Sequence, residues 1–219
     1  MIRHSFTVNK PGDKGFTVNI FDGKLEKWTY DPKPSKAALV VPTHPKCTLG
    51  NNASRKTADG ATDNAGGSDL RKKRTALPQS SPGVRCPLGK AVIVTGPYGK
   101  RRNPMPGNLR VSNIIYTTPP NYKAAGEKEC DVILAKAVAS SLKCAKTANL
   151  RAVAFVLMSA GKANGGKKSE EEVAEIIMKA IKKFKGYTDM KLVSICVLGE
   201  DKADVVKGVA LNLGYVEDE

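Results

Sequence analysis

Aromatic residues and metal-binding side chains are scarce in this sequence. Only 5% of its 219 residues are aromatic, so the stacking platforms with which many proteins bind single-stranded nucleic acid are poorly supported. The five cysteines include no CxxC pair and are accompanied by only two histidines, a pattern that argues against a structural zinc site. We therefore expect reduced, mostly buried thiols, no bound metal and no cofactor.

Long apolar runs are also absent. No stretch approaches the ~18 consecutive apolar residues of a membrane-spanning helix. The first residues are followed by polar ones and lack the apolar centre of a secretory signal. Because 41% of the residues are hydrophobic, a folded domain is favoured over a disordered chain. We expect a cytoplasmic or nuclear protein with no membrane partner.

Acidic residues are outnumbered by basic ones. The 36 Lys and Arg against 21 Asp and Glu give a net charge of +15, which favours anionic partners such as nucleotides or nucleic acid. Two short basic runs could bind a phosphate polymer such as RNA: Arg71, Lys72, Lys73 and Arg74, and Lys100, Arg101 and Arg102. The alternative is that these runs form a solvated basic face that keeps the protein soluble.

Strand and helix patterns alternate along most of the chain. A capping box of Ser169 and Glu172 begins the best-marked helix, which carries one apolar stripe to Phe184. Residues 42–89 read as a long loop with one short helix near residues 69–77. Residues 1–36 are expected to form short strands joined by turns, with residues 16–21 the clearest strand. The other expected strands are residues 37–41, 91–94, 114–116, 153–158 and 192–198, and the other expected helices are residues 127–147 and 201–211.

This alternation predicts an α/β fold with a parallel or mixed sheet covered by helices. Ligands in such folds bind beyond the carboxyl ends of the strands. Two glycine-rich turns follow expected strands, and their exposed backbone amides could face phosphate oxygens. The candidates are Ser159, Ala160, Gly161, Lys162, Ala163 and Asn164 in one turn, and Ala65, Gly66, Gly67 and Ser68 in the other. A plain connecting loop is the alternative for each turn, and an ordinary turn is the alternative for Asp22-Gly23 at the end of an earlier strand.

Several stretches resemble the macro domain family. CPLGKAVIVTGPY at residues 86–98, IIYTTPPNY at residues 114–122 and LRAVAFVLMSAG at residues 150–161 are each similar to a characteristic stretch of that family. The acidic helix start at residues 169–174 also matches. The pieces stand in the family's order over residues 16–215. The resemblance implies a single domain over residues 1–219, with a three-layer α/β/α fold around a mixed sheet of six or seven strands.

The same resemblance implies a function. Family members bind ADP-ribose, and some hydrolyse ADP-ribose derivatives. Asp22 matches an aspartate that reads adenine, and Asp69 takes the place of a carboxylate that hydrolytic members often carry. Binding of ADP-ribose or a related nucleotide is the first hypothesis, and a hydrolase that uses Asp69 is the second. A basic module for RNA or poly(ADP-ribose) that has lost the pocket is the third.

The sequence also departs from the family pattern. Residues 42–45, Pro-Thr-His-Pro, replace a motif whose last asparagine positions the distal ribose. Asn51 or Asn52 could substitute for it, within an expected insertion at residues 45–64. A second insertion is expected at residues 100–110. We therefore expect degenerate binding loops on a macro-like fold.

Overall fold

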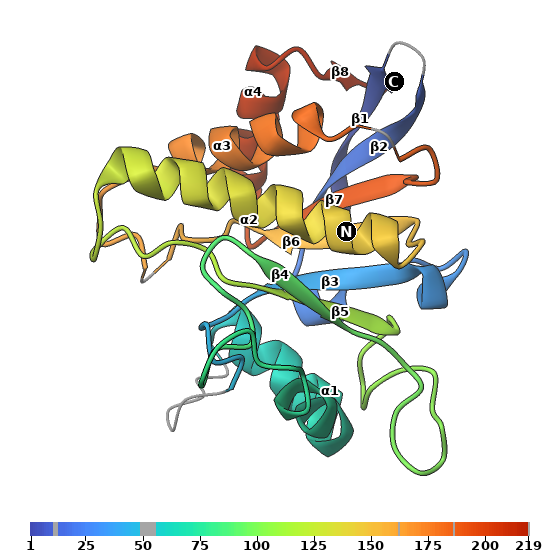
Figure 1. Cartoon of the computed structure of the whole chain (residues 1–219). Helices are drawn as coiled ribbons and strands as arrows, with labels where there is room; N and C mark the ends of the chain where they lie inside the picture. The colour runs from blue at the N-terminus through green and yellow to red at the C-terminus, as the bar shows by residue number, and fades with distance from the viewer. Residues whose placement is uncertain (11–12, 49–55, 162, 186, 219) are drawn as a thin grey trace.

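A computed structural model describes residues 1–10, 13–48, 56–161, 163–185 and 187–218. Within these ranges the chain forms one mixed sheet with helices on both faces (Figure 1). The strands are β1 (Ile2–Lys10), β2 (Asp13–Asp22), β3 (Ala37–Pro42), β4 (Ala91–Val94), β5 (Asn113–Thr117), β6 (Ala152–Val156), β7 (Leu192–Val197) and β8 (Val216–Glu217). The helices are α1 (Ala58–Thr75), α2 (Glu127–Thr147), α3 (Glu170–Lys183) and α4 (Glu200–Asn212), with two 3-10 helices, η1 (Leu25–Lys27) and η2 (Pro34–Lys36).

The sheet has the strand order β4-β5-β3-β6-β7-β2-β1-β8. Its five central strands, from β5 to β2, run parallel to one another. At the edges, β4 is antiparallel to β5, β1 is antiparallel to β2, and β8 is antiparallel to β1. Because helices cover both faces of this sheet, the expected α/β/α layers are present (Figure 1). The expected count of six or seven strands is too low by at least one, because the two-residue strand β8 pairs with β1 and extends the sheet to eight strands in the described ranges.

Alternation along β3 explains its continuous apolar sequence. Ala38 and Val40 pack into the core beneath α2, α3 and α4, while Leu39 and Val41 pack into a second core that includes Leu70 of α1. All four side chains are fully buried. A parallel strand covered on both faces needs apolar residues at every position, and this strand has them.

The C-terminal helices begin and end close to the expected residues. α2 covers residues 127–147 as predicted. The capping box at α3 is confirmed, because the Glu172 amide donates to Ser169 Oγ at 3.1 Å and the Ser169 amide donates to Glu172 Oε2 at 2.8 Å. None of the helices in the described part of the chain is both long and apolar enough to cross a bilayer.

α1 differs most from the expectation. The sequence suggested a glycine-rich turn at residues 64–69 and a helix from about residue 69, but helical structure already begins at Ala58. Gly67 interrupts it with φ 69° and ψ −163°, a conformation open almost only to glycine. The turn therefore exists as a kink between two helical halves. The first half was missed because Gly60, Gly66 and several short polar residues have low helix propensity.

Candidate functional site

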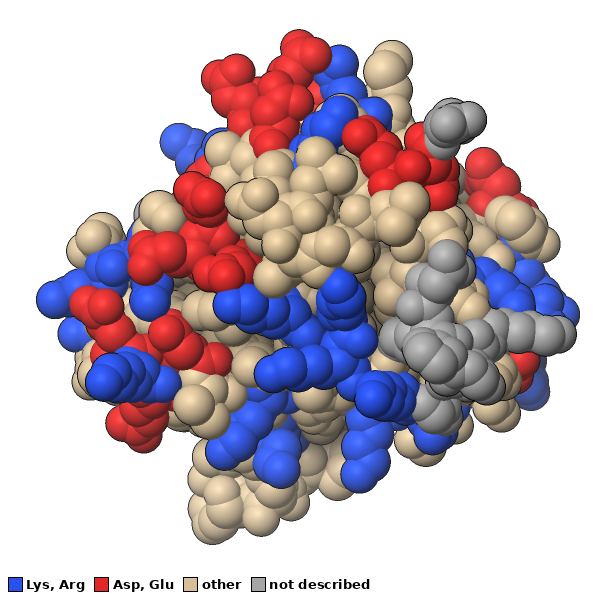
Figure 2. All heavy atoms as spheres, turned by 90° about the horizontal axis from the view of Figure 1, so that it is seen from above, with Lys and Arg blue, Asp and Glu red and all other residues tan. Residues whose placement is uncertain are grey.

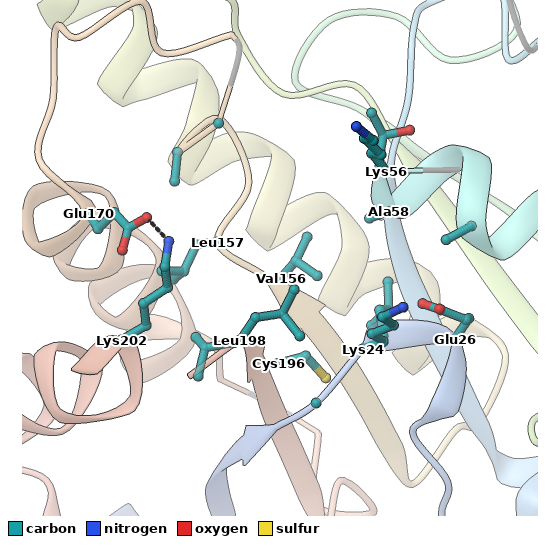
Figure 3. Close-up of a pocket in the computed structure, with 17 residues that line it drawn as sticks. Lys24, Glu26, Lys56, Ala58, Val156, Leu157, Glu170, Cys196, Leu198 and Lys202 are labelled. Carbon is teal, nitrogen blue, oxygen red and sulfur yellow. Dashed lines mark hydrogen bonds and ion pairs between the residues drawn. The ribbon is translucent and has the colours of Figure 1, made fainter. Parts of the chain in front are cut away.

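A pocket with a volume of about 610 Å³ lies beyond the carboxyl ends of β2, β6 and β7. Gly23 follows β2, Leu157 follows β6, and Leu198 follows β7, and all three line the pocket. Figure 3 shows Leu157 and Leu198. The Gly23 amide donates to the Val197 carbonyl at 2.8 Å, which joins two of these strand ends. The position agrees with the rule for ligand sites in parallel sheets.

The floor of the pocket is apolar. Val156 and Cys196 contribute to it (Figure 3), and Leu25 is also a lining residue. Cys196 is only 4% exposed, and burial raises the pKa of its thiol, so this side chain is neutral. An apolar floor suits a planar base or a sugar face rather than a bare ion.

Charged side chains surround this floor. Lys24 and Glu26 come from the η1 region, Lys56 precedes α1, and Glu170 and Lys202 belong to the first turns of α3 and α4. Figure 3 shows the ion pair between Glu170 and Lys202. Three lysines against two glutamates leave the lining with a net positive charge.

The start of α1 forms another part of the wall. Thr57 is its N-cap residue and accepts a hydrogen bond from the Gly60 amide at 3.1 Å. Thr57, Ala58 and Ala61 line the pocket. Because the first amides of a helix carry partial positive charge, this wall favours an anion.

Residues 159–161, 163 and 164 belong to the loop after β6, and only some of them line the pocket. Ala160 and Gly161 are lining residues. The Ser159 hydroxyl instead donates to the Pro120 carbonyl at 2.7 Å, and the Asn164 carboxamide accepts from the Lys168 amide at 2.8 Å. These two side chains hold the loop in shape.

Two further members of this loop were expected to bind the ligand. The Ala163 carbonyl accepts from the Tyr122 amide at 2.9 Å. Lys162 lies outside the described residues, as do Asn51 and Asn52.

The second expected turn, Ala65, Gly66, Gly67 and Ser68, is not among the residues that line this pocket. The Ala65 carbonyl accepts from the Asn108 amide at 2.7 Å, and a Cβ added to Gly66 would lie 2.2 Å from Leu70 Cδ2. This part of α1 therefore packs against its own core and the loop before β5.

Asp69 is also placed outside the lining of the pocket. A Cβ added to Gly99 would lie 2.3 Å from Asp69 Oδ2, so the carboxylate sits against the loop between β4 and β5. The carboxylates that do line the pocket are Glu26 and Glu170. In the described ranges, no group of three or more His, Cys, Asp and Glu side chains could hold a metal ion.

Asp22 ends β2 next to the lining residue Gly23, and both of its oxygens are hydrogen-bonded within the chain. Oδ1 accepts from the Gly199 amide at 3.0 Å, and Oδ2 accepts from Arg3 Nη2 at 3.1 Å. These bonds, that from Gly199 first, hold the pKa of Asp22 below its usual range. The aspartate is at the edge of the pocket, but Arg3 already occupies one of its oxygens.

The first basic run does not form a uniform exposed surface. Arg74 is 1% exposed, which contradicts its expected role in binding a polyanion. Arg71 is exposed but forms an ion pair with Asp63, and Lys73 Nζ donates to the Thr95 carbonyl at 2.5 Å. Lys72 is exposed, and so are Lys100, Arg101 and Arg102 of the second run.

Several lining residues were not identified from the sequence. Lys24 and Lys56 lie in loops and Lys202 lies in the first turn of α4, and none of the three stands in a glycine-rich sequence. Thr57 could have been found as a threonine N-cap with a helix-forming stretch behind it. The residues after β7 could have been found by applying the strand-end rule to the last strand as well as to the earlier ones.

Known proteins share this architecture. The family model of the Macro domain matches residues 53–177. A macro domain-containing protein of Xanthomonas axonopodis pv. citri is 30% identical over 138 residues, which cover 63% of this chain and 69% of that protein.

The structural comparison extends further along the chain. The Oceanobacillus iheyensis macrodomain determined with ADP has a TM-score of 0.74 at 20% identity, and 97% of each chain is covered. The Trypanosoma brucei macrodomain in complex with ADP has a TM-score of 0.67 at 17% identity, with 88% of this chain and 68% of that chain covered. A variant of the Oceanobacillus protein determined with ADPR also has a TM-score of 0.74 at 20% identity, over 95% of this chain and 98% of that one. The family model match, which spans more than half of the sequence, and this shared architecture show that the chain belongs to the macro domain family.

Proposed function

We propose that the chain binds ADP-ribose, or a closely related nucleoside diphosphate, in the pocket beyond β2, β6 and β7. The observation that carries this proposal is an apolar floor bordered by the start of α1 and by Lys24, Lys56 and Lys202. Helix amides and ammonium groups favour a diphosphate, and the floor can receive a base or sugar. The volume of about 610 Å³ is suitable for a ligand of this size.

The related macrodomains support the same ligand class. The Oceanobacillus protein was determined with ADP and, as a variant, with ADPR, and the Trypanosoma protein with ADP. In this chain the start of α1, with Thr57, Ala58 and Ala61, lines the pocket, whereas the glycine-containing residues 65–68 are not among the lining residues. We therefore infer that the backbone amides at the start of α1, and not a glycine-rich turn, face the phosphates of the ligand.

Calorimetric titration with ADP-ribose tests it, together with two matched variants. Ala61→Phe places a large ring on the side of α1 that lines the pocket, whereas Ser68→Phe places the same ring on an exposed position of α1 outside the lining. We expect Ala61→Phe to lose at least about tenfold in affinity and Ser68→Phe to bind like the wild type. Absence of heat and of a thermal shift with millimolar ADP-ribose would exclude the proposal.

Binding without hydrolysis agrees best with the carboxylates of the pocket. A hydrolase needs a carboxylate that can orient water or stabilise positive charge at the ribose. Glu170 is held by Lys202, and Asp69 is not a lining residue, which leaves Glu26. If the protein hydrolyses an ADP-ribose derivative, Glu26→Gln is the variant that should abolish the activity, and Asp69→Ala should leave it unchanged.

A second candidate function is binding of a phosphate polymer on the surface near α1. The contacts of Lys73 with Thr95 and of Asp69 with Gly99 bring the end of α1 against the loop that carries Lys100, Arg101 and Arg102. Two basic runs that are distant in sequence thus lie on neighbouring segments. Basic side chains also gather elsewhere, in the middle of the face seen from above in Figure 2. A test of specific binding near α1 must therefore compare variants on this surface with variants on another basic part of the protein.

A further inference from the structure

Arg74 is a buried cation inside α1. It is 1% exposed, and its guanidinium carbon lies 4.4 Å from the centre of the Tyr116 ring. Nη2 donates to Asp59 Oδ2 at 2.9 Å, and Nη1 lies 2.8 Å from Asp59 Oδ1. Nε donates to the Cys47 carbonyl at 2.8 Å. The guanidinium is thereby fixed in one place by groups from three segments.

The contact with Asp59 depends on the kink in α1. Residues 59 and 74 would lie about 22 Å apart along a straight helix at 1.5 Å per residue, beyond the reach of an arginine side chain. The break at Gly67 turns the second half of α1 back toward the first. The last turn of the helix can therefore neutralise a carboxylate in its first turn.

Asp59 stands at the edge of the ligand pocket. It belongs to the first turn of α1, between the lining residues Ala58 and Ala61. Its side chain is 18% exposed, and its carboxylate accepts from Thr43 Oγ1 at 2.9 Å as well as from Arg74. Since Thr43 directly follows β3, these bonds hold the carboxylate on the side of α1 that faces this strand end.

A free carboxylate at this position would compete with an anionic ligand for the start of the helix. Negative side chains and bound anions are stabilised by the same helix amides, and two negative charges that share one helix start repel each other. Neutralising Asp59 removes this competition.

We propose that Arg74 is a positioning residue that keeps the Asp59 carboxylate neutralised and turned toward the end of β3, so that the start of α1 is left to the phosphates of the ligand. This inference rests on the proposed binding of a nucleoside diphosphate. It assigns Arg74 no contact with the ligand.

A double-mutant comparison of ADP-ribose affinity tests the inference. We expect Arg74→Met to weaken binding about tenfold, because the Asp59 charge is then uncompensated. Adding Asp59→Asn should restore the affinity to within about threefold of the wild type, since the uncompensated charge at the helix start is then removed. The buried Asp63 carboxylate, whose Oδ1 lies 3.6 Å from Arg74 Nη1, keeps its ion pair with Arg71 in both variants. Arg71→Met is the matched control on the same helix, because Arg71 is exposed and pairs with Asp63 rather than with Asp59. Asp63 still lies 3.6 Å from Arg74 Nη1 in this variant, so we expect it to bind like the wild type.

If Arg74→Met fails to fold, Asp59→Asn alone still tests the inference, because it removes the carboxylate and leaves Arg74 in place. We expect this variant to bind ADP-ribose at least as tightly as the wild type. A loss of tenfold or more in Asp59→Asn, or a folded double variant that binds no better than Arg74→Met, would overturn the inference. No binding by the wild type would overturn the proposed function as well, whereas the other two outcomes leave that function intact.

Discussion

Arg3 and Asp22 form an ion pair across the first two strands, with 3.1 Å between Nη2 and Oδ2. Arg3 Nη1 also lies 3.3 Å from Glu200 Oε1, and the other oxygen of Asp22 accepts from the Gly199 amide. The pair thus connects β1, the end of β2 and the start of α4 at the edge of the pocket. We therefore expect loss of this ion pair to change both the stability of the protein and its affinity for a nucleotide.

The first prediction concerns stability and pH. The hydrogen bonds from Gly199 and Arg3 lower the pKa of Asp22 in the folded state. A carboxyl group with a lowered folded pKa stabilises the protein above its unfolded pKa, about 4, and this contribution is lost as the pH falls through the folded value. Asp22→Asn should therefore lower the urea midpoint at pH 7, and the difference from the wild type should shrink toward pH 3.

Asp189→Asn provides the control for this prediction. Asp189 is an exposed carboxylate in the loop before β7, and its substitution should change the midpoint little at either pH. Equal destabilisation by Asp22→Asn at pH 7 and pH 3 would show that the loss comes from packing or from the amide, and not from the charge.

The second prediction concerns the base of the nucleotide. An ionised carboxylate has about four acceptor positions, and three of those of Asp22 are used by Arg3 Nε, Arg3 Nη2 and the Gly199 amide. If Asp22 accepts a hydrogen bond from the adenine amino group, Arg3→Ala should make Asp22 Oδ2 available to that amino group. We expect the ratio of ADP to GDP affinity to rise about fivefold, the equivalent of one net hydrogen bond.

The ratio is the informative quantity here. Loss of the Arg3 charge alters the affinity for both diphosphates, but it alters them equally and cancels in the ratio. Calorimetry of ADP and GDP with the wild type, Arg3→Ala and the double variant Arg3→Ala/Asp22→Asn gives the three ratios. A rise that persists in the double variant would contradict the role of Asp22.

The third prediction concerns the kink in α1. Gly67 has φ 69° and ψ −163°, and no heavy atom lies within 4 Å of an added Cβ, so the cost of Gly67→Ala comes from the backbone alone. We expect a loss of about 1–3 kcal/mol in the free energy of unfolding. Gly208→Ala in α4 also meets open space, but in a regular helix, and should stabilise the protein by about 0.5–1 kcal/mol.

Urea denaturation of both alanine variants measures this difference. The contrast isolates backbone conformation, because neither added methyl group meets another atom. A Gly67→Ala variant as stable as the wild type would mean that the kink is not required, and the contact between Arg74 and Asp59 would then need another explanation.

Much of the fold could be predicted because its signals are local. The apolar stripe and capping box of α3 and the continuous apolar runs of β3 and β6 are properties of neighbouring residues. The three-layer arrangement then follows from the alternation of strands and helices. β8 was missed because two residues carry no periodicity, and it forms only because β1 offers an edge.

The site was less predictable because it is assembled from distant segments. Lys24 and Lys202 reach one pocket only after β2 and β7 pair in parallel. The burial of Arg74 depends on the fold of α1 at Gly67, and a sequence run of four basic residues gives no sign of it. The sequence Ala65-Gly66-Gly67-Ser68 predicts a phosphate-binding turn, whereas in the structure Gly66 leaves room for the Leu70 side chain.

The last prediction separates a specific polyanion surface from general basic charge. For single-stranded RNA, each phosphate contact contributes about 0.7 to the slope of log affinity against log salt concentration. Arg101→Ala/Arg102→Ala changes two exposed cations beside α1, and Lys183→Ala/Lys185→Ala changes two exposed cations at the end of α3, on the opposite face of the sheet. Fluorescence anisotropy with a labelled RNA homopolymer at several salt concentrations should show a slope smaller by about 1.4 for the first pair only. Equal changes in both pairs would indicate that the RNA follows the net charge of +15, because each pair removes the same charge from a different face.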